Sequence, residues 1–165
     1  MTYLPIDNSP DHAAALGRLI AHWGDLESQF RLLFQFLLKI DNMKAHFINQ
    51  EFLSVPAKIT FLRRINHFFT LDASSKHQID ELLKTIEGLN KQRNRFIHAT
   101  WQYTIQDQLM RQQSSLPAGN HKKRSKPLAK FTSQDIQNVV QAIEQTSQSL
   151  QNLIIPLLVG LVVPL

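Results

Sequence analysis

Three residues near the middle of the chain could together carry out acid–base chemistry on a phosphate: Arg93, Asn94 and His98. An imidazole takes up and releases a proton near neutral pH. A guanidinium holds phosphate oxygens and stabilises extra negative charge on them. Asn94 precedes His98 by four residues and shares a helix face with it, so it could orient the imidazole or the phosphate.

The helix that carries these residues is the best marked in the sequence. Its apolar residues recur at helical spacing from Ile79 to Leu89. Extended at about 100° per residue, the pattern places Arg93 near the centre of the apolar stripe, with Asn90 also on the stripe. A charge there is costly unless it is paired, or unless the stripe opens onto a ligand or a partner. Glu27, beside the apolar stripe of the first helix, is one potential internal partner, and an exposed Glu27 is the alternative.

Arg93 and His98 lie roughly 140° apart around an ideal helix. One chain could therefore bring both to a common ligand only near a frayed helix end, or with help from a second copy. An alternative interpretation assigns both to the helix end, where cations are favourable by about 0.3–1 kcal/mol. That explains His98. It does not explain why Arg93 occupies the apolar stripe while Arg95 does not, and this difference favours a site.

The pattern Arg93-Asn94-x-x-x-His98 resembles the signature of the HEPN superfamily, in which His follows Arg after four to six residues, often with Asn directly after the Arg. The resemblance implies a small, all-helical, dimeric protein. It also implies metal-independent RNA cleavage, in which the RNA 2′-hydroxyl attacks the adjacent phosphorus in a cleft shared by two copies. His98 would move the proton, Arg93 would stabilise the transition state, and Asn94 would orient His98 or the phosphate.

We therefore expect a HEPN-like endoribonuclease, as a toxin or defence component, with no metal and no cofactor. A protein antitoxin or another regulatory partner could restrain the enzyme. The first alternative is a HEPN-like module that no longer cuts and instead binds RNA or a protein partner. The second is a helical interaction protein without a nucleic-acid role. A phosphate held jointly by Arg93 and His98 would favour the endoribonuclease or the HEPN-like binding module. An Arg93 fully paired with Glu27 would favour the interaction protein.

The positive charge of the chain is concentrated in one segment. Between Asp107 and Asp135 there is no acidic residue, and the cations of this interval outweigh the whole net charge of +5. A basic loop at about 112–127, rich in Ser, Lys, Gly and Pro, is expected to be mobile and to attract phosphate backbones. A solvated loop without a partner is the alternative. The expected RNA-binding residues are Arg111, Lys122, Lys123, Arg124 and Lys126.

Length and composition predict one domain, residues 1–165, with its own core, since 43% of the residues are hydrophobic. The chain has no cysteine, so it has no disulfide framework. No basic-then-apolar leader is visible at its start, and a cytoplasmic location is expected. The apolar tail, 153–165, is shorter than the roughly 20 residues of a membrane span. It is expected to cover the core or a subunit interface.

The expected fold is all-α, an up-and-down bundle of four main helices with a small β-hairpin before the last one. Residues 101–105 alternate like a strand and are expected to pair with 128–131. Trp101 could stack a base, although packing of the strand is the alternative. The expected helices are 10–38 with Ser9 as cap, a short helix at 44–53, one opening at 54–56 with Ser54 as cap, the motif helix from 71–75 to His98, and a last helix. This last helix opens at Thr132-Ser133-Gln134-Asp135 in the manner of a cap with an acid in the first turn.

Overall fold

The structure, a computed structural model, describes residues 9–68, 72–98, 100–103, 109–112 and 129–160. These residues are mostly helical, as predicted for an all-α protein. The helices are α1 (Pro10–Ser28), α2 (Phe30–Leu38), α3 (Asn42–Glu51), α4 (Val55–Phe68), α5 (Ala73–Ile97) and α6 (Ser133–Gly160).

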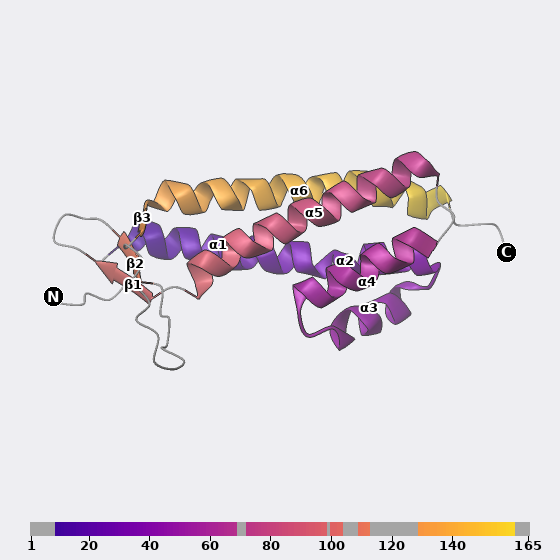
Figure 1. Ribbon diagram of the computed structural model, residues 1–165, viewed down its shortest axis with the longest axis horizontal. Helices are drawn as coiled ribbons and strands as arrows, with labels where there is room; N and C mark the ends of the chain where they lie inside the picture. The colour runs from indigo at the N-terminus through magenta and orange to yellow at the C-terminus, as the bar shows by residue number, and fades with distance from the viewer. Residues whose placement is uncertain (1–8, 69–71, 99, 104–108, 113–128, 161–165) are drawn as a thin grey trace, which may run out of the picture.

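The long helices surround one core. In Figure 1, α6 runs along α1 and α2, α5 crosses beside them, and α3 and α4 lie near α2. The apolar stripes of these helices meet in a single cluster, which removes their surface from water and so holds the helices together. The largest fully buried side chains are Phe30, Phe34, Leu19, Leu26, Leu33, Leu37, Ile59, Leu62, Ile79, Leu83 and Ile86.

The predicted first helix is interrupted at Gln29, so the prediction of one helix over 10–38 was wrong at this residue. The backbone N–H of Gln29 donates to the carbonyl of Leu26 (3.1 Å), three residues back. Such a bond tightens the chain for one turn. The Gln29 side chain also donates to the hydroxyl of Ser147 on α6. The break therefore coincides with a polar contact between two helices, which periodicity along one helix does not report.

Polar caps mark the starts of the later helices, as the sequence predicted. Ser54 accepts a hydrogen bond from the Ala57 backbone N–H (3.4 Å) before α4. Before α6, the Thr132 backbone N–H donates to the Asp135 carboxylate (2.7 Å), and the Asp135 N–H donates back to the Thr132 hydroxyl (3.2 Å). This reciprocal pair is a capping box with Asp in the acidic position, and it fixes where α6 begins.

The predicted cap at Ser9 was wrong in its chemistry. The Ser9 side chain makes no capping hydrogen bond to the start of α1. Its hydroxyl instead contacts Nδ1 of His12 at 2.5 Å, and both residues are buried. His12 offers a partner one turn along the helix, and that partner competes with the backbone N–H groups for the same hydroxyl.

A buried amide joins α4 to α5, the helix that carries the candidate site. Asn66 is fully buried, and its Nδ2 donates to the Lys76 carbonyl (3.1 Å) and to the Asp80 carboxylate (2.9 Å). We expect Asn66→Ala to lower the free energy of unfolding by about 2 kcal/mol, because it removes both bonds and leaves a small void. Urea denaturation measures this. The control is Asn138→Ala on the exposed side of α6, and equal losses in the two variants would contradict the prediction.

Three short strands lie between α5 and α6: β1 (Thr100–Tyr103), β2 (Leu109–Gln112) and β3 (Ala129–Phe131). They form an antiparallel sheet in the order β1-β2-β3. Thr100 pairs with Gln112, and Leu109 pairs with Phe131. The predicted pairing of 101–105 with 128–131 was therefore wrong, because β2 lies between them and hydrogen-bonds to both. In Figure 1, this sheet lies next to the C-terminal end of α5, the end of the helix that carries the candidate site.

The end of α6 includes the first part of the apolar tail. Leu150 and Ile154 are buried in the core, whereas Ile155 and Val159 are exposed. Residues 161–165 lie outside the described residues. Among the helices that the structure describes, none combines the length and the apolar character that crossing a membrane requires.

Candidate functional site

Arg93 lies in the last turns of α5, against α1. Its guanidinium carbon is 5.6 Å from the centre of the Trp23 ring, and Trp23 is only 2% exposed. The Nη1 group donates to the side-chain oxygen of Asn94 (2.9 Å). The ring face attracts the cation, and the amide oxygen accepts one of its five N–H groups. The two contacts hold a half-buried guanidinium in one orientation.

The charge of Arg93 is not neutralised by an acid among the residues that the structure describes. Its Nε is buried and has no hydrogen-bond partner there. A partly buried cation with a free donor is unfavourable until an acceptor reaches it. The remaining Nη donors of this half-buried side chain could bind a phosphate oxygen, so an Arg93 without an acidic partner suits an anionic ligand.

The predicted partner of Arg93, Glu27, is occupied elsewhere. Its carboxylate accepts a hydrogen bond from Nζ of Lys58 at 3.0 Å, and Lys58 is 5% exposed. Lys58 also lies 5.9 Å from the centre of the Phe30 ring. Glu27 follows Trp23 by one turn on α1, but α4 brings a buried ammonium to it. The possible pairing of Glu27 with Arg93 is therefore not formed, and the Glu27 side chain is 36% exposed.

The buried face near the end of α5 is rotated from the predicted stripe. Asn90 is 7% exposed, as expected for a residue on the stripe. Phe96 is also buried, whereas Arg93 and Ile97 are only half-buried. The reason is the sheet, because the Phe96 ring meets the ring of Phe131 edge to face at 5.2 Å. Arg93 thus lies at the border of the core, where one side of it contacts Trp23.

His98 is the residue at which α5 ends. It has φ −96° and ψ 19°, and its backbone N–H donates to the Asn94 carbonyl (3.2 Å). Its side chain is exposed. No hydrogen bond joins the imidazole to Arg93 or Asn94. The side chains of Arg93 and Asn94 are therefore in contact. The side chain of His98, although close to them in the sequence, is directed to solvent.

The remaining predicted site residues are not tested by the geometry. Trp101 lies in β1 and Arg111 in β2, and the structure describes only their backbone. The other predicted RNA-binding residues, and the loop at about 112–127 beyond its first residue, lie outside the described residues; these residues are Lys122, Lys123, Arg124 and Lys126.

Trp23 is the site residue that the sequence did not reveal. It lies on the apolar stripe of α1, where an indole is ordinary core. Its contact with Arg93 joins residues seventy positions apart, so no local spacing encodes it. The one available signal was the misplaced guanidinium itself, which requires a partner of some kind on a facing helix.

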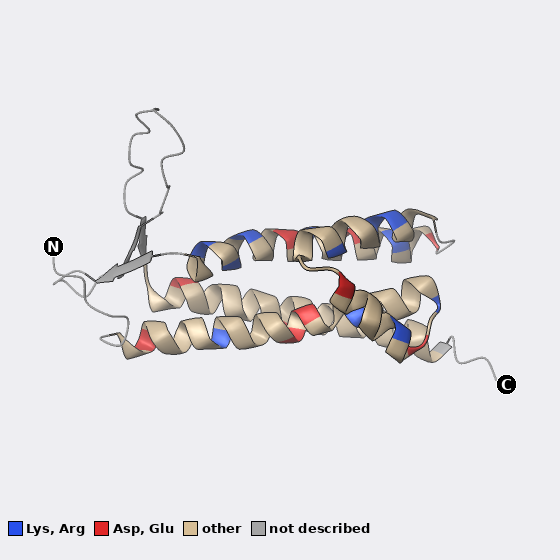
Figure 2. Cartoon of the chain, turned by 90° about the horizontal axis from the view of Figure 1, so that it is seen from below, with Lys and Arg blue, Asp and Glu red and all other residues tan. Residues whose placement is uncertain are grey.

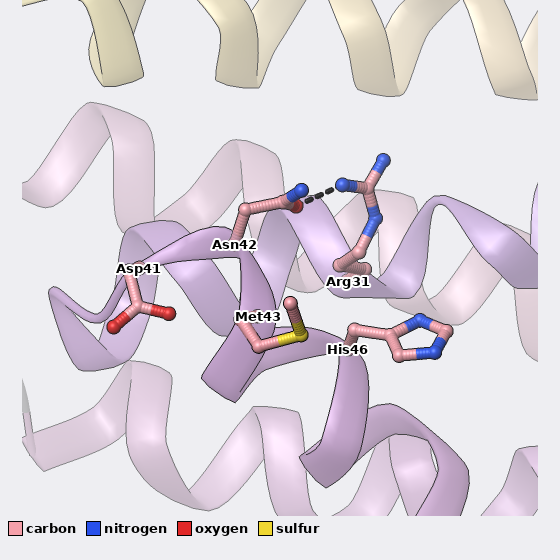
Figure 3. A pocket seen from close by; sticks show the side chains of 5 residues that line it. All are labelled: Arg31, Asp41, Asn42, Met43 and His46. Atoms are coloured by element: carbon pink, nitrogen blue, oxygen red, sulfur yellow. Dashed lines mark hydrogen bonds between the residues drawn. The ribbon is translucent and has the colours of Figure 1, made fainter.

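A hollow beside α2 and α3 is also lined by an arginine and a histidine. It has a volume of about 400 Å³ and is lined by Arg31, Asp41, Asn42, Met43 and His46. Figure 3 shows the Arg31 guanidinium engaged by Asn42, with the His46 ring directed away from that pair. Asp41 binds Lys44 (2.8 Å). In the described part of the chain, no aromatic ring holds the Arg31 guanidinium as Trp23 holds that of Arg93, which makes this hollow the weaker candidate.

Within the described part of the chain, no group of three or more His, Asp or Glu could hold a metal ion. Comparisons of the sequence and fold with models of known protein families, with curated proteins and with solved structures gave no match. The resemblance to the HEPN superfamily thus depends on Arg93, Asn94 and His98.

Proposed function

We propose that this protein is a HEPN-like, metal-independent endoribonuclease that acts as a homodimer. The observation that carries the proposal is Arg93. Its guanidinium is half-buried, oriented by Trp23 and Asn94, free of any described acid, and five residues from an exposed histidine at the helix end. A simple charge at a helix terminus needs neither burial nor orientation, whereas binding of a phosphate benefits from both.

The proposed reaction is attack by the RNA 2′-hydroxyl on the adjacent phosphorus. His98 accepts the 2′-hydroxyl proton as the 2′-oxygen bonds to phosphorus, and it delivers that proton to the departing 5′-oxygen. The products are a 2′,3′-cyclic phosphate and a free 5′-hydroxyl. Arg93 binds the non-bridging phosphate oxygens, on which negative charge increases in the transition state. Asn94 holds the guanidinium at Nη1 and leaves its other donors for the phosphate.

A second copy of the chain supplies the missing geometry. Arg93 faces α1, whereas His98 faces solvent. One chain therefore does not direct both groups at one phosphate. In the proposed dimer, Arg93 of each copy meets His98 of the other. We propose the up-and-down bundle of four main helices as the scaffold, with α1 and α2 acting as one of them, and a toxin or defence role in the cytoplasm, restrained by a protein antitoxin.

The test is an RNA cleavage assay in EDTA with the wild type and the variants Arg93→Ala and His98→Ala. We expect the wild type to produce 2′,3′-cyclic phosphate ends and both variants to be slower by at least about a hundredfold. The matched controls are Arg18→Ala, on the exposed surface of α1, and His77→Ala, at the other end of α5. Circular dichroism and gel filtration verify that every variant is folded and keeps its oligomeric state.

Three outcomes of this assay count against the proposal. Cleavage that EDTA abolishes would show a metal-dependent reaction. An equal loss of cleavage rate in the control variants would show that the activity does not depend on Arg93 and His98. Absence of cleavage on structured and unstructured RNA would remove the enzymatic proposal.

A non-cleaving HEPN-like binding module is the second candidate. The observation in its favour is that Trp23 and Asn94 already take up part of the Arg93 guanidinium, as they would in an architectural role. This candidate predicts that Arg93→Ala weakens RNA or protein binding and that no substrate is cleaved. A drop in dimer stability in Arg93→Ala, with no effect on RNA, would assign the residue to architecture alone.

A further inference from the structure

A row of cations follows the outer face of α5 toward its end. Lys91, Arg95 and His98 are separated by four and three residues, so they share one helix face, and all three are exposed. Along the helix axis they extend over about 10 Å. Figure 2 shows Lys and Arg residues near the end of α5 that leads into the sheet.

The row begins at an ion triad between α4 and α5. The Glu87 carboxylate accepts hydrogen bonds from Nζ of Lys91 (3.1 Å) and from Nη2 of Arg63 (3.0 Å). The hydrogen bond from Lys91, followed by the smaller effect of the one from Arg63, holds the pKa of Glu87 below its ordinary value of 4.5. The carboxylate therefore stays ionised at neutral pH and balances only one of the two cations. One positive charge is left over at this turn.

Beyond the triad the positive charge is not balanced. Arg95 forms no ion pair with any described residue. The sequence contains no acidic residue between Glu87 and Asp107. The charge of Arg95, one turn after Lys91, is therefore unbalanced on the side of α5 that leads to His98. We call Arg63, Lys91 and Arg95, which lead toward His98, the α5 cation row.

We propose that the α5 cation row binds the phosphate backbone of single-stranded RNA and leads the strand to His98. The part played by His98 rests on the proposed function, whereas the binding by Arg63, Lys91 and Arg95 does not. Cations that neutralise phosphates release condensed counterions, which favours binding. Arg95 lies about 160° around α5 from Arg93. The row therefore approaches the substrate from the side away from Trp23.

The surroundings of the row favour a single nucleic-acid strand over other anionic surfaces. None of the large exposed apolar side chains belongs to α5 in the described part of the chain. A protein interface centred on Lys91 and Arg95 would need such anchors. A helix lying on a membrane needs an apolar face to insert, and the apolar face of α5 is buried in the core. A narrow row along α5, with Arg63 beside it on α4, suits a single strand, whose backbone a line of positive charge can follow.

The test measures binding to a fluorescent 2′-O-methyl oligouridylate, which no 2′-hydroxyl attack can cleave. We expect the double variant Lys91→Gln/Arg95→Gln to bind roughly tenfold more weakly at physiological salt. The slope of log K against log salt should fall by about 1.4, because two phosphate contacts of about 0.7 each are lost. Glu87→Gln should bind more tightly than the wild type, because it removes the one negative charge of the row.

The matched control is Lys39→Gln/Lys44→Gln, which removes the same charge at the α2–α3 junction, near the other end of the molecule (Figure 1). If this control loses as much affinity as Lys91→Gln/Arg95→Gln, binding follows net charge and the row is overturned. Wild-type protein that binds anionic lipid vesicles but not the oligonucleotide also overturns it.

The two proposals fail separately. Row-dependent binding without cleavage of unmodified RNA leaves the row in place and removes the nuclease. If the wild type cleaves RNA, and Lys91→Gln/Arg95→Gln both binds and cleaves RNA as well as the wild type does, the nuclease proposal stands and the row proposal fails.

Discussion

An equimolar mixture of the Arg93→Ala and His98→Ala variants should recover about one quarter of the wild-type ribonuclease activity, although each variant alone is inactive. Random pairing makes about half of the dimers mixed. If each site combines Arg93 of one copy with His98 of the other, as proposed, one of the two sites in a mixed dimer is complete. The other site lacks both groups.

This result follows from the directions in which the two side chains lie. Within one chain, Arg93 packs on Trp23, and the exposed His98 makes no contact with it. If each phosphate is held by Arg93 of one copy and attacked with the help of His98 from the other, complementation is expected. If a single copy supplied both groups, every site in a mixed dimer would lack one of them, and the mixture would stay inactive.

The experiment mixes the variants under conditions that exchange subunits and then measures cleavage in EDTA. Its control mixes Arg93→Ala with the double variant Arg93→Ala/His98→Ala, which has no intact Arg93 to contribute and must remain inactive. Isolation of mixed dimers with two different affinity tags should raise the recovered activity to about one half. An inactive mixture in which mixed dimers are demonstrated would contradict pairing between copies.

The local features of this fold could be predicted from the sequence. The caps at Ser54 and Thr132 were visible as residue types, and they act through contacts within one turn. The burial of Asn90 followed from the helical phase of its apolar neighbours. A pattern with a period of 3.6 residues carries such information because one face of a helix meets one environment.

The contacts between elements could not be predicted in this way. Glu27 was a potential partner of Arg93 because it lies beside the apolar stripe of the first helix, whereas Arg93 lies near the centre of its own stripe. The buried ammonium of Lys58 on α4 instead occupies Glu27. Whether Lys58 or Arg93 reaches the Glu27 carboxylate depends on how α1, α4 and α5 pack. The apolar pattern of each single helix does not determine this packing. Trp23 was hidden for the same reason, since a tryptophan on a stripe signals burial and not the identity of its neighbour.

The sheet shows where local pattern misleads. Residues 101–105 and 128–131 each resemble strands, so pairing them was the simplest solution. The strand β2 instead pairs with both. Its sequence, Leu-Met-Arg-Gln, has too short an alternation to stand out beside a polar loop. This sheet also places Phe131 on Phe96, which rotates the buried face of α5 and leaves Arg93 at its border.

The second large effect concerns stability: Glu27→Ala should lower the free energy of unfolding by about 2–3 kcal/mol. Lys58 is 5% exposed and has Glu27 as its acidic partner at 3.0 Å. Loss of the carboxylate leaves an ammonium group buried next to the Phe30 ring without a counter-charge. Because the Glu27 side chain is 36% exposed, water can reach part of the gap. The loss should therefore fall below the 3–5 kcal/mol typical of a fully buried pair.

Urea denaturation of two further variants separates this cause from a general loss of packing. Glu81→Ala breaks an exposed pair with Lys84 (3.3 Å) and should change stability by less than about 0.5 kcal/mol. The double variant Glu27→Leu/Lys58→Met removes both charges and replaces them with apolar side chains, so it should recover most of the stability that Glu27→Ala loses. If the double variant is less stable than Glu27→Ala, the pair contributes more than the cost of desolvating its charges. In that case its hydrogen bond, and not the avoidance of an unpaired ammonium, holds α4 against α1.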